Sequence, residues 1–90
     1  MNINDLAIRY EEFKRSLNKH SEMQITDNRS IVLDGCRRVI EYNENCIRLE
    51  LSAVAVSVVG IELSMRNFNV GGIVIEGQIH SLTFISKEDL

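Results

Sequence analysis

Hydrophobic residues near the N-terminus recur with the period of an α-helix. Leu6, Tyr10, Phe13 and Leu17 follow one another at spacings of four, three and four residues, which places them on one stripe of a helix. This spacing predicts an amphipathic helix within an N-terminal unit of helix and linker over residues 1–22. Because an isolated helix of this length has little stability, the stripe must dock either on the rest of this chain or on a partner.

Beyond the linker, alternation replaces the helical period and β-branched residues dominate, which is typical of β-strands. We expect a β domain over residues 23–90, with turns at residues 42–45 and 67–72, where Asn and Gly tolerate tight reversals. A two-residue first turn would place Cys46 opposite Glu41. The predicted strands cover residues 30–34, 37–42, 46–52, 53–59, 61–67, 73–76 and 79–86.

Several of these strands are apolar on one face only, as residues 47–51 and 61–65 show. Such strands cover each other in a layered fold. Three β-rich segments run into Gly35, Gly60 and Gly77, which we expect to be bulges or corners where a strand bends or changes sheet. Their unequal spacing argues against a β-helix. The predicted fold class is mainly β: a small antiparallel β-sandwich of about six to seven short strands with one N-terminal amphipathic helix, forming a single domain.

The most informative segment is residues 51–61, which contains no charged side chain and is apolar on both faces. An exposed strand of this kind would pair with other chains. It is therefore expected either at the centre of the sheet or at a site that binds another subunit or a partner. The candidate interface residues are these valines together with the helical stripe: Val54, Val56, Val58, Tyr10, Phe13 and Leu17.

Composition narrows the classes of function. The chain has 90 residues, with ten basic against thirteen acidic side chains and a formal charge of −3. A chain of this size buries only about 60% of its surface on folding, which leaves little room for an elaborate catalytic pocket. Its negative charge does not favour nucleic-acid binding. No run approaches the roughly 20 apolar residues that cross a bilayer, so we expect a cytoplasmic protein without a transmembrane segment.

The residues capable of chemistry are few and scattered. His20 and His80 stand in no spacing that indicates a catalytic triad or a metal site, and an exposed strand histidine is the simpler explanation of His80. Cys36 and Cys46 have no partner at zinc-binding spacing, so we expect reduced, packed thiols. Gly71 and Gly72 precede a strand and form no phosphate loop. We predict no enzyme activity, no catalytic residue, no cofactor and no metal.

Three segments of the chain, residues 38–49, 58–65 and 73–85, resemble the sporulation protein family typified by YabP and YqfC. The most specific part is the closing motif, an apolar residue and Glu76-Gly77 followed by Ile79, Leu82 and Phe84, which is similar to the YqfC branch. The resemblance covers residues 25–86, most of the chain. A departure is the unusually apolar segment 52–59, where the family pattern leads us to expect a more polar turn.

The resemblance implies a small β-sandwich protein of endospore-forming bacteria, made in the mother cell and acting beside a membrane protein, with a peripheral place at the forespore membrane. It supplies no catalytic residue. The leading hypothesis is a non-catalytic interaction or assembly module with a protein partner, an integral membrane sporulation protein or further copies of the chain itself. The alternative is a small-ligand or nucleic-acid binder that uses an arginine face, formed by Arg37, Arg38, Arg48 and Arg66.

Overall fold

The structure is a computed structural model that describes residues 20–90. The predicted amphipathic helix, with Tyr10, Phe13 and Leu17, lies outside the described residues. Within them the chain is almost entirely β. Its elements are β1 (Glu22–Thr26), β2 (Ser30–Asp34), β3 (Arg38–Tyr42), β4 (Cys46–Glu50), β5 (Ala55–Asn69), β6 (Gly72–Ile85) and a short 3₁₀ helix, η1 (Lys87–Asp89).

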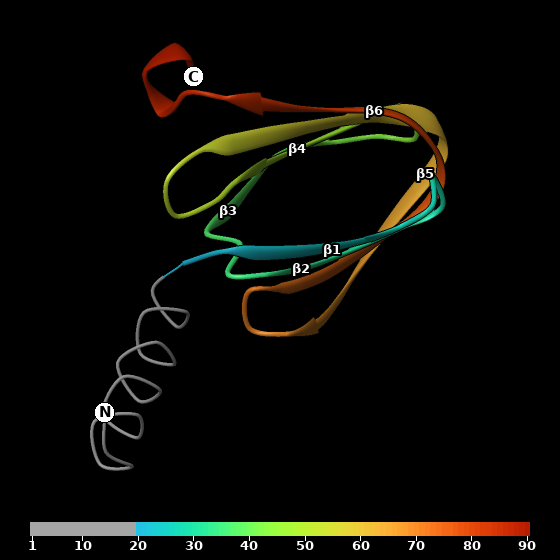
Figure 1. The fold of residues 1–90 in the computed structure, drawn as a ribbon, viewed down its shortest axis with the longest axis horizontal. Coiled ribbons are helices and arrows are strands. Elements are labelled where there is room, and N and C mark those ends of the chain that lie inside the picture. The colour runs from blue at the N-terminus through green and yellow to red at the C-terminus, as the bar shows by residue number, and fades with distance from the viewer. Residues whose placement is uncertain (1–19) are drawn as a thin grey trace, which may run out of the picture.

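All six strands belong to one antiparallel sheet with the order β1-β2-β6-β5-β4-β3. Figure 1 shows that this sheet folds over on itself, so that β3 and β4 lie across from β1 and β2 while β5 and β6 run through both halves. The mainly β class and the antiparallel pairing are confirmed. The expected sandwich needs correction, because its two layers are halves of one continuous sheet.

The fold-over lies where the pairing of β5 with β6 is irregular, between Val59 and Ser64. Gly60 is buried there, and a Cβ on it would collide with the carbonyl oxygen of Gln78. Opposite, Gly77 has a φ of +143°, which side chains rarely allow. The prediction that these two glycines are corners is confirmed. Because the strands continue through the corners, the predicted strands 53–59 and 61–67 merge into β5, and 73–76 and 79–86 merge into β6; Ala53, Val54 and Ser86 lie outside them.

The first strand, β1, was not predicted. It pairs along its whole length with β2, from Glu22 opposite Asp34 to Thr26 opposite Ser30. Four of its five side chains are exposed and Met23 alone packs against the core. A strand held mainly by backbone pairing at the edge of a sheet has little hydrophobic alternation. This explains why the sequence of β1 does not clearly predict a strand.

The core lies between the two halves of the sheet. Leu49 stands opposite Val56 and Ile47 opposite Val58, and all four side chains are at most 1% exposed. Burial of a side chain of this size stabilises a fold by about 1.5–3 kcal/mol. The rest of the core is apolar in the same way and consists of Ile31, Leu33, Leu51, Leu63, Ile73 and Ile75. The predicted apolar face of residues 47–51 is thus buried, whereas in residues 61–65 Leu63 is buried and Ile61 is 43% exposed.

The two predicted hairpin turns are present, with details that the sequence did not supply. The first contains three residues, and the side-chain oxygen of Asn43 accepts hydrogen bonds from the backbone N–H groups of Asn45 and Cys46, both at 2.8 Å. The longer loop places Arg48, and not Cys46, opposite Glu41, with an irregularity beside it. The second turn is tight, with Asn69 opposite Gly72.

The substitution Gly60→Ala tests the fold-over. Its methyl group would collide with the backbone at Gln78, so we expect the free energy of unfolding to fall by about 2 kcal/mol or more, measured by urea denaturation. The matched control is Glu62→Gly in the same bend. Glu62 is exposed and has a φ of 54°, so glycine should change the free energy of unfolding by less than about 1 kcal/mol. Equal stability of Gly60→Ala and the unchanged chain would contradict the proposed role of this corner.

Candidate functional site

The structure separates the predicted interface valines. Val56 and Val58 are 0% and 1% exposed and lie in a strand with neighbours on both sides, β4 and β6. They are therefore core residues of this chain and not a surface for a partner, which corrects their assignment as candidate interface. Val54 precedes β5 and is half-buried at the edge of the core. Of the two alternatives for the uncharged segment, the central strand is the one observed.

The second half of β6 has a free edge on the described surface. Its neighbour β2 accompanies β6 only from Ile73 to Glu76, whereas β5 accompanies it to Ile85. Past that point the N–H groups of Gly77 and Ile79 donate to the carbonyl oxygens of Arg29 and Asn28, at 3.1 and 2.8 Å. From residue 80 to residue 85, no strand of the described chain pairs with this side of β6. The backbone groups that face this side are available to another strand.

The other edges of the folded sheet are protected in ways that natural edges commonly use. The edge strand β3 carries Arg38 in an ion pair with Glu50 at 3.6 Å and has an irregular register. Beyond the bend, the edge of β5 carries Arg66, and its Met65 N–H donates to the hydroxyl of Tyr42 at 3.1 Å. The edge strand β1 is short and begins with Glu22. These charges and contacts discourage pairing with a foreign strand.

The second half of β6 has no such protection. Residues 77–86 contain no Asp, Glu, Lys or Arg, and Phe84 is 61% exposed although it stands opposite the buried Val56. The absence of charge in residues 77–86 was a signal for this edge, but the interface prediction rested on the longer charge-free run at residues 51–61. Only the pairing shows which of the two runs is central and which is open.

Beside the end of this edge lies an apolar groove of about 290 Å³. Its apolar walls are formed by Met23, Leu51, Val54 and Phe84, and His20, Ser21, Ser52 and Ala53 complete its lining. Ser21 ties the two halves of the sheet together here. Its hydroxyl donates to the carbonyl oxygen of Gly35 at 2.8 Å and accepts from the Ser52 N–H at 3.0 Å. The groove is therefore held in shape at its polar end and is hydrophobic elsewhere.

The arginines of the alternative hypothesis are paired with acidic side chains. Arg38 lies 3.6 Å from Glu50, Arg48 lies 3.6 Å from Glu41, and Arg66 lies 3.1 Å from Glu76. Arg38 and Arg48 each stand directly opposite their glutamate on the neighbouring strand, although exposed pairs contribute little to stability. Each of these three positive charges has a negative charge beside it, so they do not form a uniformly basic surface.

The residues capable of chemistry lie apart. His80 is exposed on β6, while Cys36 lines a hollow of about 190 Å³ whose lining does not include His80. Burial raises the pKa of the Cys36 thiol, a backbone hydrogen bond at Arg38 partly opposes the rise, and the charge of Glu50 adds to it. A raised pKa favours the unreactive thiol. Both cysteines are free, and residues 20–90 contain no group of three His, Cys, Asp or Glu placed to hold a metal ion.

The fold and surface define a small antiparallel β protein with one open, charge-free strand edge. The model of the YabP family matches residues 17–90, so the chain belongs to the YabP family, and this membership suggests a role associated with spore formation. The match does not distinguish the YqfC branch, which stays a prediction. No curated protein and no solved structure matches the chain. In the part of the chain that the structure describes, no helix has the length and hydrophobicity to cross a membrane.

The raised pKa of Cys36 predicts low thiol reactivity near neutral pH. With Cys46→Ser removing the other thiol, a disulfide reagent should modify Cys36 more slowly than it modifies free cysteine. The rate should go on rising with pH after that of free cysteine has levelled off, because thiolate forms later. The measurement is the pH profile of the modification rate in the folded chain. A profile that levels off below that of free cysteine would show an activated thiol and contradict this description.

Proposed function

We propose that this chain is a non-catalytic protein-interaction module of spore formation that binds its partner by strand addition to the free edge of β6. The observation that carries the proposal is the backbone of residues 80–85, which is extended, paired on one side only and without charged side chains. Strand addition gains affinity from main-chain hydrogen bonds and specificity from the side chains that alternate beside them. Six residues match the usual length of a β-strand.

The alternation along the edge indicates which partner segment fits. Leu82 and Phe84 stand opposite the core residues Val58 and Val56 and so face the inner side of the sheet, whereas Ser81 and Thr83 stand opposite Val59 and Ser57 on the outer side. A fitting partner is an extended segment with apolar side chains on its inner face and polar or small side chains on its outer face. Cross-strand pairs of this kind contribute about 0.2–1 kcal/mol each.

The partner we infer is a membrane protein of the sporulating mother cell that presents such a segment to the cytoplasm. Family membership supports the association with sporulation, and the resemblance noted in the sequence supports the membrane protein. A second copy of the chain is the competing occupant of the edge. Binding of a polyanion by the arginine face receives less support, because Arg38, Arg48 and Arg66 each face a glutamate.

The double substitution Ser81→Lys with Thr83→Lys tests the proposal. Both side chains are exposed, so the chain should stay folded by circular dichroism, while two lysines along the edge should block strand addition as charged edges do. We expect a sporulating strain that carries only this variant to form heat-resistant spores at the level of a strain that lacks the chain. Light scattering of the purified protein shows whether self-association changes as well.

The matched control is Val32→Lys with Val59→Lys. These valines are also exposed, at 38% and 41%, and add the same charge, but they lie on β2 and β5, which have paired neighbours on both sides at these residues. The control should support normal sporulation. A folded edge variant that sporulates as well as the control would contradict strand addition at β6.

A further inference from the structure

The hydrogen bonds around β5 show which backbone groups of β6 face its free edge. On the β4 side, the N–H of Gly60 donates to the carbonyl oxygen of Asn45 at 3.0 Å. Just before β5 begins, the carbonyl oxygen of Val54 accepts from the N–H of Leu51 at 2.8 Å. Because the direction of the backbone groups alternates along an antiparallel strand, the even-numbered residues from 54 to 60 face β4. The odd-numbered residues 55, 57 and 59 therefore face β6.

The same alternation continues in β6. Residues 55, 57 and 59 stand opposite Ile85, Thr83 and Ser81, so these three residues of β6 exchange their backbone hydrogen bonds with β5. The residues between them, Leu82 and Phe84, turn their N–H and C=O groups the other way, toward the free edge. A strand added at this edge would therefore be held by the backbone of Leu82 and Phe84.

The side chain of Phe84 ends a row of apolar residues across the inner face of the sheet. Leu49 stands opposite Val56, and Val56 stands opposite Phe84. Leu49 and Val56 are fully buried, whereas Phe84 is 61% exposed, because no strand of the described chain continues the row past β6. In an added strand, the residue opposite Phe84 would be the next member of this row, with its Cβ about 5 Å from that of Phe84.

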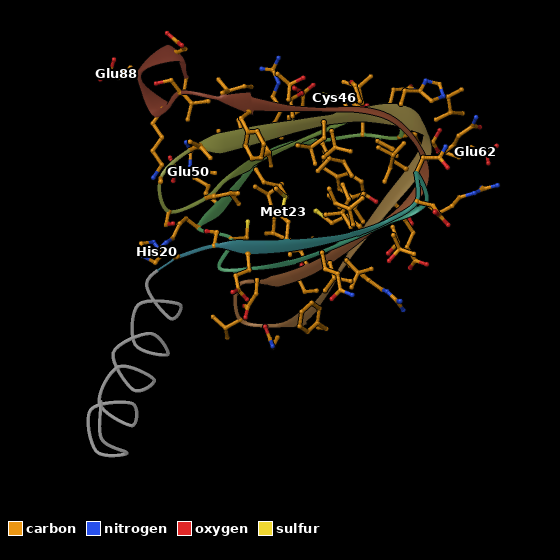
Figure 2. All side chains as sticks on the ribbon, viewed as in Figure 1. His20, Met23, Cys46, Glu50, Glu62 and Glu88 are labelled. Carbon is orange, nitrogen blue, oxygen red and sulfur yellow. The ribbon has the colours of Figure 1, made fainter. Side chains whose placement is uncertain are left out.

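The apolar groove beside Phe84 offers further contacts to a large side chain at this position. Phe84 shares the apolar lining of the groove of about 290 Å³ with Met23, Leu51 and Val54. Figure 2 shows Met23 between the two halves of the sheet, where it packs against the core. An aromatic or long aliphatic side chain would cover the exposed ring of Phe84 next to these residues. A small side chain would leave the ring exposed, and a charged one would lose hydration against it.

We propose that Phe84 selects the strand that binds to this edge, by packing its ring against a large apolar side chain directly opposite. This selection rests on the proposed strand addition and adds a requirement to it, since main-chain hydrogen bonds alone do not distinguish one extended segment from another. The partner segment carries an aromatic or long aliphatic residue opposite Phe84. The next residue on the same face of the partner strand is apolar and stands opposite Leu82.

Two synthetic peptides test this selection on the full chain. The first, Lys-Thr-Phe-Thr-Val-Thr-Lys, alternates apolar and polar side chains, and the second has Ala in place of Phe. Titration followed by NMR gives the Kd of each peptide, and amide exchange shows where it pairs. We expect the first peptide to slow exchange of the Leu82 and Phe84 amides. It should bind about ten-fold more tightly than the second, because its ring is buried against Phe84.

A pair of variants assigns this preference to Phe84. Phe84→Ala removes a ring that is largely exposed, so the chain should stay folded by circular dichroism. The matched control, Thr83→Ala, changes the neighbouring exposed residue on the outer face. We expect Phe84→Ala to reduce the preference for the Phe peptide to about two-fold or less, and Thr83→Ala to leave it unchanged.

The outcomes separate this selection from strand addition itself. Equal binding of the two peptides to the unchanged chain, with slowed exchange of the Leu82 and Phe84 amides, would overturn the selection and leave strand addition standing. A preference that a folded Phe84→Ala variant retains would do the same. If neither peptide slows exchange of these two amides, strand addition at this edge is wrong, and the selection by Phe84 is wrong with it.

Discussion

The close approach of two strands at the fold-over is the constraint on which the rest of this structure depends. Strands β5 and β6 run through both halves of the sheet, and at Gly60 their backbones leave no room for a side chain. The bend brings the apolar face of β4 and the first half of β5 onto that of β2 and the first half of β6, so one sheet supplies both walls of the core. A single sheet that forms both walls suits a chain of 90 residues, because a chain of this size can form only a small core.

The same bend creates the edge that we propose as the binding site. Because β6 leaves its partner β2 when it crosses the bend, its second half lies at an edge in the other half of the sheet. Three edges of the described sheet carry charges or a side-chain contact, and the fourth, residues 80–85, carries none. In a monomeric protein such an edge is a risk for aggregation. We interpret it as a binding edge that a partner covers.

Much of this fold was predictable from sequence because its signals are local. Alternation in β4 predicted a one-sided strand correctly, and Gly60 and Gly77 predicted corners correctly. At the bend the alternation was right only in part, because Leu63 is buried but Ile61 is 43% exposed. The unpredicted features depend on long-range pairing. The exposed side chains of β1 gave little periodicity. The interface prediction rested on the charge-free residues 51–61, whereas the strand order places Val56 at the centre of the sheet and leaves Phe84, in the charge-free residues 77–86, at an edge. The position of a strand within a sheet depends on which strands pair with it, and the sequence of that strand alone does not predict this.

Amide hydrogen exchange along β6, measured on the purified full chain in dilute solution, tests the central claim most directly. A strand paired on one side protects only the amides that face its neighbour. For residues 80–85 we therefore expect fast and slow exchange in alternation, while residues 55–59 of β5, paired on both sides, exchange slowly throughout. Uniformly slow exchange across residues 80–85 in the monomer would mean that the chain already covers this edge, and it would contradict the account.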